Sequence, residues 1–386
     1  MQPDISTPTP PVAPTPVPTA PPVRDNMPSP ARFNMDSIMI WVKAHKWWVL
    51  AIVIVVLVVA AAAAHELLHH KAKPAAVAPP PAAKVAAPTA ATPILAPLTG
   101  LPTTAATAAE PVFGVVIENS PDARPQSGLS QAGVVYETLA EGGITRFMAV
   151  FQDQQPTTLG PVRSLRPYFI DWIQEYNNAP IAHAGGSDQA LAEVPQDGVK
   201  SMNGLTYGSY FHRTSDRYAP HNLYTDSASL ISLMQKNNWV TAPSFTMWKY
   251  KADAPEATPS HPSVTLNFST VLYQAKYSYD GACDCYNRFI DGTPSIERNT
   301  GKQIQVKNVV AIVVQTSFDA KGHALDTTIG SGKAVVFNDG GATVGTWSKA
   351  SRTGRTEFLD SSGQPIPLNA GNTWIGAIDQ YGSMVY

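Results

Sequence analysis

From Val112 to its end, the chain alternates short apolar runs with polar turns, which predicts a folded region of many short elements. Three runs of strand length come first, at residues 112–119, 134–140 and 145–152. Pro167 suits the first position of an apolar helix, and Ser187 can cap a second helix. Residues 227–239 have the pattern of a third. This mixture predicts an α+β or α/β domain over residues 110–245.

Helical patterns fade after the connector that follows this region. Residues 260–386 consist of short alternating runs that are rich in β-branched and aromatic residues. Two Asp-Gly pairs, Asp291–Gly292 and Asp339–Gly340, have the sequence of tight hairpin turns. We therefore expect the second domain, over 260–386, to be β-rich.

A different pattern lies near the start of the chain. Residues 47–64 carry no charge and no proline, and they are about long enough to cross a bilayer. Trp41, Trp47 and Trp48 resemble an aromatic belt at one end of that run. A signal peptide would be shorter and nearer the N-terminus, and a core helix would adjoin folded sequence. We therefore predict a single transmembrane helix that anchors the chain in a membrane.

Charged residues on the two sides of this run bear on its orientation. Four basic residues precede the run and two follow it, namely Arg24, Arg32, Lys43, Lys46, Lys71 and Lys73. The bias favours the N-terminus inside. We therefore expect the C-terminal domains to be extracytoplasmic.

Proline is unevenly distributed, because most of the 35 prolines lie in two tracts beside the apolar run. Such Pro, Ala and Thr-rich segments bury too little surface to fold, so we expect disorder. The predicted organisation is a Pro-rich tail (1–40), a transmembrane helix (47–64), a linker (65–109), an α/β family domain (110–245) and a β-rich domain (260–386). The formal net charge of −2 offers no basic field, so no nucleic-acid partner is expected.

Two sequence features suggest metal or thiol chemistry, but we assign a functional site to neither of them. His65–His69 contains the H-E-x-x-H spacing of zinc proteases, but it leads into a linker and has no obvious third ligand. We therefore predict no metal site and no cofactor. Cys283 and Cys285 are either a free or a bridged pair on a hairpin, since one pair is too few for a structural zinc site.

Arg163 and Arg166 are the most conspicuous candidates for binding, because they come directly before a predicted helix. The N-terminus of a helix favours anions, and arginine recognises carboxylates and phosphates with two parallel hydrogen bonds. The alternative is internal pairing with Glu118, Glu137 or Glu141, and the sequence leaves the two interpretations about even.

A second polar group comes from glycine-rich and aromatic loops. His183 precedes the glycines at 185–186, and residues 211–225 carry imidazole, guanidinium and amide groups. Taken singly, each of these residues is typical of a self-bonded loop. The full predicted ligand-binding set is Glu118, Asn119, Arg124, Glu137, Arg146, Arg163, Arg166, His183, Ser187, His221, Asn222 and Tyr224. Arg352 and Arg355 form another pair, which lies either on a solvated edge or at an interdomain contact.

Several stretches carry a family resemblance. The segments are "VVIENSPDARPQSGLSQAGVVYETLAEGGITRFMAVF", "GPVRSLRPYFIDW", "APHNLYT" and "IGSGKAVVFNDGGATVGTWSKASRTGRTEF". Together they resemble the YerB-like bacterial envelope proteins, from Pro97 onward. The resemblance implies a bacterial extracytoplasmic protein with two domains of unknown function, and it supplies no reaction. Members are often lipoproteins; this chain departs in having no cysteine near its start.

Two functions are compatible with these residues. The first is a binding or scaffold module for an anionic or polyhydroxylated envelope ligand, such as a wall polymer or an envelope protein. The second is a hydrolase or transferase acting on a cell-wall-type substrate, with His183 or His221 as general base and Glu118 or Glu137 as its partner. The second function requires the acid and the base to lie within hydrogen-bond reach of one point.

Overall fold

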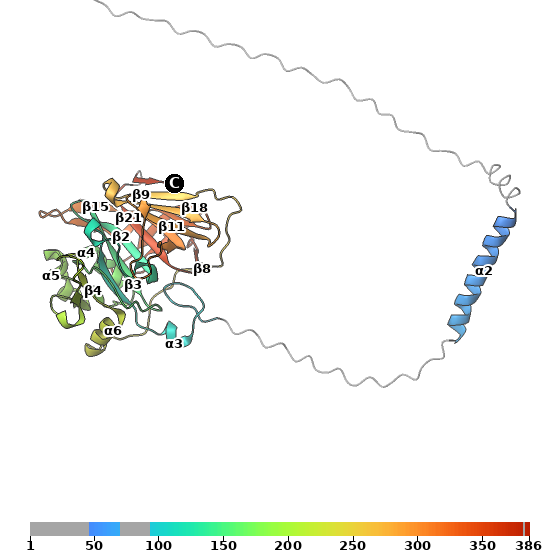
Figure 1. The fold of residues 1–386 in the computed structure, drawn as a ribbon, viewed down its shortest axis with the longest axis horizontal. Helices are drawn as coiled ribbons and strands as arrows, with labels where there is room; N and C mark the ends of the chain where they lie inside the picture. Colours follow the sequence, from blue (N-terminus) through green and yellow to red (C-terminus); the bar gives the residue numbers. More distant parts are fainter. Residues whose placement is uncertain (1–45, 70–92, 381–382) are drawn as a thin grey trace, which may run out of the picture. The chain divides into compact units, whose positions relative to one another are not determined.

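The computed structural model describes residues 46–69, 93–380 and 383–386, which belong to two compact units divided after Thr89 (Figure 1). The predictions for the tail (1–40) and for residues 70–92 of the linker lie outside the described residues. The larger unit begins at Ala90 and holds all the strands described below. Ala96 and Leu98, near its start, are fully buried in it.

The first unit contains the helix α2 (Lys46–His69), whose side chains from Leu50 to Val59 are about half exposed or more where they are described. In the described part of the chain, no helix combines the length and the apolar character that crossing a membrane requires. The transmembrane helix predicted at residues 47–64 is therefore not confirmed. His65–His69 lies at the end of α2, and the described residues contain no group of three or more acidic, His or Cys side chains placed to hold a metal.

One ten-stranded mixed sheet runs through the second unit. Its strands, in spatial order, are β19 (Glu357–Leu359), β18 (Gly341–Lys349), β17 (Gly330–Asn338), β14 (Asn308–Val313), β21 (Thr373–Ile378), β2 (Val134–Glu141), β3 (Ile144–Phe151), β1 (Phe113–Glu118), β4 (Ile181–His183) and β5 (Ser201–Asn203). Strand β21 is parallel to β14 on one side and to β2 on the other. The red strand β21, from residues 260–386, thus lies beside β2, from residues 110–245, in Figure 1.

Both faces of this sheet are covered. Along β1, Phe113, Val115 and Ile117 belong to one hydrophobic cluster and Val116 to the other, as the two-residue period of a strand requires. Buried side chains of α4 (Pro167–Gln174) and α5 (Asp188–Gln196) belong to the Val116 cluster. The other cluster includes α6 (Ser227–Lys236) and side chains of a second sheet.

The second sheet has six strands, all antiparallel. They are β12 (Thr293–Pro294), β11 (Cys285–Ile290), β10 (Gln274–Asp280), β9 (Ser263–Asn267) and β22 (Met384–Val385), with β13 (Gln305–Val306) paired to β11. Small elements complete the unit: α3 (Ala105–Ala108) and the two-stranded pairs β6 (His212–Arg213) with β7 (Leu223–Tyr224), β8 (Tyr250–Lys251) with β20 (Leu368–Asn369), and β15 (Gln315–Phe318) with β16 (Ala324–Thr327).

Most predicted local elements are confirmed. The three early strands, the three helices and the Ser187 cap of α5 all form. Both Asp-Gly pairs turn hairpins in the left-handed region, with φ of 53° and 70° at 291–292 and 54° and 81° at 339–340. The fold as a whole is β-rich with few helices, and the sheet of the first region continues into the second through β21.

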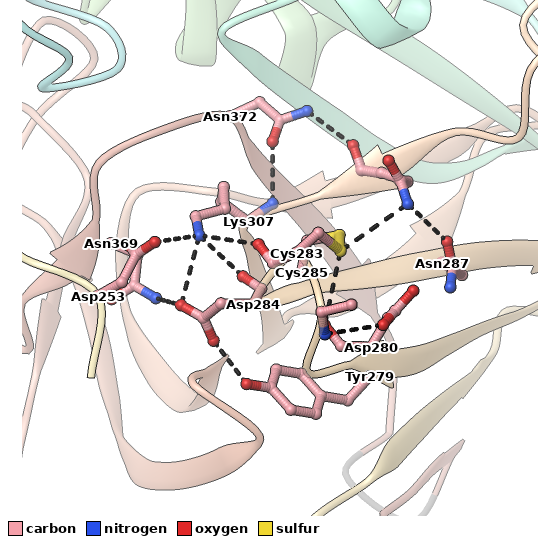
Figure 2. The surroundings of a disulfide bond; sticks show 12 residues. Asp253, Tyr279, Asp280, Cys283, Asp284, Cys285, Asn287, Lys307, Asn369 and Asn372 are labelled. Atoms are coloured by element: carbon pink, nitrogen blue, oxygen red, sulfur yellow. Dashed lines mark hydrogen bonds and ion pairs between the residues drawn. A yellow bond between two sulfur atoms is a disulfide. The ribbon is translucent and has the colours of Figure 1, made fainter. Parts of the chain in front are cut away.

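Cys283 and Cys285 are joined in a disulfide, which settles the question that the sequence left open. The bridge lies in the turn between β10 and β11 (Figure 2). Lys307 reaches this turn, and its amino group donates a hydrogen bond to the main-chain oxygen of Asp284 at 2.9 Å. The same amino group forms an ion pair with Asp253, so the turn is held by charge as well as by the covalent bond.

We predict that residues 90–386 unfold in one cooperative transition, because β21 completes the sheet of the first region. A fragment of residues 90–258 should lack cooperative unfolding, since it exposes the β2 edge and one apolar face of the sheet. Circular dichroism melts and amide NMR spectra of both chains check this. A fragment with dispersed amide signals and a sharp melt would contradict it.

Candidate functional site

The loop before α4 runs beside β1 as an extra extended segment, and this places Arg163 next to Glu118. Arg163 N donates to Val116 O at 2.9 Å, and Glu118 N donates to Pro161 O at 2.9 Å. On its other side, Arg163 O accepts from Ala184 N, just after β4. The backbone therefore fixes the positions of two charged side chains that lie 45 positions apart in the sequence.

Glu118 is the centre of the site, because three side chains converge on one of its oxygens. His221 Nδ1 lies 2.8 Å, Ser120 Oγ 2.8 Å and Arg163 Nε 3.2 Å from Glu118 Oε1. The second oxygen, Oε2, is buried without a hydrogen-bond partner. Since a carboxylate only accepts hydrogen bonds, Nδ1 of His221 is the donor in its contact with Glu118.

A second cluster lies beside the first, where Arg146 on β3 is the register partner of Glu118. Arg146 and Arg166 share one carboxylate: the former binds Oε1 of Glu141 and the latter lies 2.5 Å from its Oε2. Burial opposes the ionisation of Glu141, but the two guanidinium groups outweigh it and hold its pKa below the ordinary value. Arg163 and Arg166 both make the internal pairs that the sequence offered as the alternative, the former with Glu118 and the latter with Glu141.

A hollow of about 350 Å³ adjoins His221 and is open to solvent. It is lined by Asp122, Asp216, Arg217, Tyr218 and His221. Tyr218 is 90% exposed, and the Arg163 side chain is 22% exposed, against 1% for Arg146. Arg163 and His221 are thus the nitrogen-bearing side chains of the two clusters that a solute can reach.

Several predicted residues lie elsewhere and have structural roles. His183 is fully buried, and both ring nitrogens are occupied, by Gly185 O at 2.7 Å and by Ser201 Oγ at 2.7 Å. Burial lowers the pKa of His183 to about 4. Ser187 accepts from Ala190 N as the cap of α5. The structure does not bring these two side chains to the Glu118 cluster.

Glu137, Asn119 and Arg124 belong to a buried network under the second sheet. Glu137 Oε2 accepts from Arg288 Nη2 at 2.9 Å and from Trp374 Nε1 at 3.0 Å. Its other oxygen accepts from Asn119, whose own amide oxygen accepts from Arg124 at 3.2 Å. Arg288 is a residue that sequence reasoning missed, although the alternation of β11 places it on the buried face.

Asn222 and Tyr224 organise the loop that carries His221. The amide oxygen of Asn222 accepts from Arg213 at 2.7 Å. The hydroxyl of Tyr224 accepts from Arg217 at 2.6 Å and from Arg298 at 2.8 Å. These two predicted residues therefore position the lining of the hollow. Arg217 and Tyr218 belong to the polar loop at 211–225 that the sequence singled out, while Ser120 and Asp122 were not predicted.

Comparison with known proteins assigns the chain to a family. Residues 98–240 match the family model described as "Protein of unknown function (DUF3048) N-terminal domain", and residues 264–375 match its C-terminal counterpart. The chain is 33% identical over 302 residues to "Putative lipoprotein YerB" of Bacillus subtilis (strain 168), covering 76% of this chain and 89% of that protein. The crystal structure of the B. subtilis YerB protein matches with a TM-score of 0.70 at 30% identity, covering 76% of this chain and 99% of that one. The arrangement of the two family regions therefore matches that of YerB.

We predict that Arg288→Met destabilises the fold by about 3–5 kcal/mol, because it leaves the Glu137 carboxylate buried and unpaired. The double variant Glu137→Gln/Arg288→Met should recover part of that loss. Lys321→Met removes a solvent-exposed pair with Asp188 and serves as a control that should change stability little. Urea unfolding measures all three, and equal effects of the Arg288 and Lys321 changes would contradict the structural role of this pair.

We predict that His183 makes the fold acid-sensitive. Its folded pKa of about 4 lies below the usual 6.5, so the stabilisation is complete above about pH 6.5 and is lost as the pH falls toward 4. The full change is on the order of 3 kcal/mol. His183→Gln should flatten this part of the pH profile in urea unfolding, whereas exposed His212→Gln should not. A profile unchanged by His183→Gln would contradict the assignment.

Proposed function

The chain belongs to the YerB-like family of DUF3048 proteins, and we propose that it binds an anionic or polyhydroxylated ligand of the cell envelope beside His221. The observation that carries the proposal is the meeting of Arg163, His221 and Glu118 next to an open hollow. A wall polymer or a segment of an envelope protein offers the acidic and hydroxyl groups that such a hollow can bind.

The charge balance of the two clusters supports an anionic group on the ligand. Arg146, Arg163 and Arg166 face only two carboxylates, those of Glu118 and Glu141, so one positive charge is left over. Arg163 meets Glu118 through its Nε atom, and its side chain is 22% exposed, so a ligand oxygen can approach the remainder of the guanidinium group.

The family assignment supports a location outside the cytoplasm and at the membrane, because the B. subtilis relative is named as a lipoprotein. The Cys283–Cys285 disulfide fits an oxidising compartment. The exposed apolar side chains of α2 offer a surface for attachment to a membrane. On this proposal, the second unit carries the ligand site and the region around α2 keeps it near the envelope.

We predict that Arg163→Gln weakens ligand binding about 10-fold or more, since it removes a charge-assisted hydrogen bond. Isothermal titration of residues 90–386 with glycerol phosphate oligomers and with N-acetylmuramate separates phosphate from carboxylate recognition. Lys276→Gln, an exposed change on β10, is the charge-matched control. The proposal fails if neither ligand binds saturably, or if the Arg163 and Lys276 variants lose affinity equally.

An enzyme is the second candidate, favoured by the 2.8 Å contact between His221 Nδ1 and Glu118. A carboxylate that orients an imidazole leaves Nε2 able to accept a proton, as a general base must. Nε2 lies 3.9 Å from Asp122, at the hollow. His221→Gln would abolish turnover of a wall-type substrate but keep binding if the chain is a hydrolase or transferase. His183, its ring nitrogens already bonded, is not proposed as the base.

A further inference from the structure

A larger hollow, of about 640 Å³, lies at a different place in the second unit. Its walls come from three segments: residues 174–178 at the C-terminal end of α4, residues 244–246 of the connector, and residues 353–355 before β19. None of its lining residues lines the hollow beside His221. It therefore forms where the first family region, the connector and the second family region meet, a position where ligand pockets are common.

Neutral hydrogen-bonding groups dominate the walls of this hollow. The lining residues include three with amide side chains, three with hydroxyl side chains and one aromatic residue, namely Gln174, Asn177, Asn178, Ser244, Thr246, Thr353 and Phe245. The charged lining residues, Glu175 and Arg355, bind each other at 2.7 Å. The lining therefore carries no net charge.

The charged pair forms a rigid wall of the hollow. Arg355 is enclosed by aromatic rings, with its guanidinium carbon 3.7 Å from the centre of Trp248, 4.4 Å from Tyr176 and 5.5 Å from Phe245. Such contacts stabilise a cation. The sequence left open whether Arg355 lies on a solvated edge or at an interdomain contact. Its hydrogen bond to Glu175 places it at a contact between the two family regions.

Glu175, the acidic partner of Arg355, is also fixed by several contacts. It accepts from Thr356 N at 2.8 Å and from Thr356 Oγ1 at 2.7 Å, and Lys349 lies 3.3 Å away. Burial disfavours its charged form, but Arg355 and Lys349 keep the pKa of Glu175 below its ordinary value. Because these bonds already exist, a ligand would meet a wall that needs no rearrangement.

Asn177 and Asn178 end the α4 segment in a conformation that few residues other than glycine adopt. Their φ angles are 60° and 51°, in the left-handed region. Asn178 donates to Gly198 O at 3.0 Å, while its amide oxygen has no hydrogen-bond partner. Asn177 is exposed at the hollow. Asn177 thus presents its amide where a ligand can use it, while the amide of Asn178 is held by the protein.

We propose that this hollow is a binding site for a neutral saccharide. Hydroxyl groups of a sugar pair with amide and hydroxyl side chains, and the apolar face of a sugar ring packs on an aromatic ring such as Phe245. The lining itself does not call for an anion, because Glu175 and Arg355 bind each other there. Lys349, the second cation bonded to Glu175, is fully buried and lies outside the lining, and the C-terminal end of α4 adds the negative end of the helix dipole. This inference goes beyond the proposed site at His221 and does not rest on it.

The test is an amide NMR titration of residues 90–386 with N,N′-diacetylchitobiose at millimolar concentrations. We expect saturable shifts at residues 174–178, 244–246 and 353–355. Asn177→Gly keeps the left-handed backbone and removes only the amide, so it should weaken affinity about fivefold. Asn238→Gly is the matched control, because Asn238 has a φ of 56° at the end of α6 and does not line the hollow.

The acidic sugar N-acetylmuramate provides the contrast in charge. Tighter binding of this sugar at the same residues would overturn the assignment of a neutral ligand, and absence of saturable shifts with diacetylchitobiose would overturn the site. Equal effects of Asn177→Gly and Asn238→Gly would also overturn it. Shifts confined to residues 118–122 and 216–221 would support the His221 site alone, so the two proposals fail independently.

Discussion

The pairing of β21 with strands on both of its sides is the interaction on which the second unit depends. Strand β21 is hydrogen-bonded to β14 of its own region and to β2 of the other, and all six of its residues are buried. Trp374 on this strand donates to Glu137 of β2 and lies 4.5 Å beneath the guanidinium of Arg288. Two regions that match separate family models are therefore parts of one folded body.

The burial and pairing of the charged side chains distinguish residues with a structural role from residues of the candidate sites. Where a charge is buried and fully bonded, as for Glu137 with Arg288, it cannot respond to a solute without breaking the core. Around Glu118, by contrast, Arg163 and His221 are partly exposed beside a hollow. The Arg355 pair is intermediate, because it is buried but forms the wall of a cavity lined by neutral groups.

Local structure was readable from sequence, and long-range pairing was not. Apolar periods and the Asp-Gly pairs located the strands, helices and hairpins, because those signals depend on neighbours in the chain. Nothing local indicates that β21 joins β2, since that contact depends on packing across the whole unit. The same limit affected the site: Arg163 and His221 were found together with Glu118, but His183 has a similar sequence context and is enclosed in the core. The Asn177–Asn178 pair at the end of a helix was an available signal for an exposed turn.

The closing contact of the sheet has a consequence for how the protein is made. The hydrogen bond from Thr138 on β2 to Ala377 on β21 joins residues 239 positions apart. The sheet cannot be completed until almost the entire chain has been synthesised, and contacts of such long range slow folding. Until β21 has been made, the backbone groups along one edge of β2 have no strand to pair with, so the growing chain presents an open sheet edge for most of its synthesis.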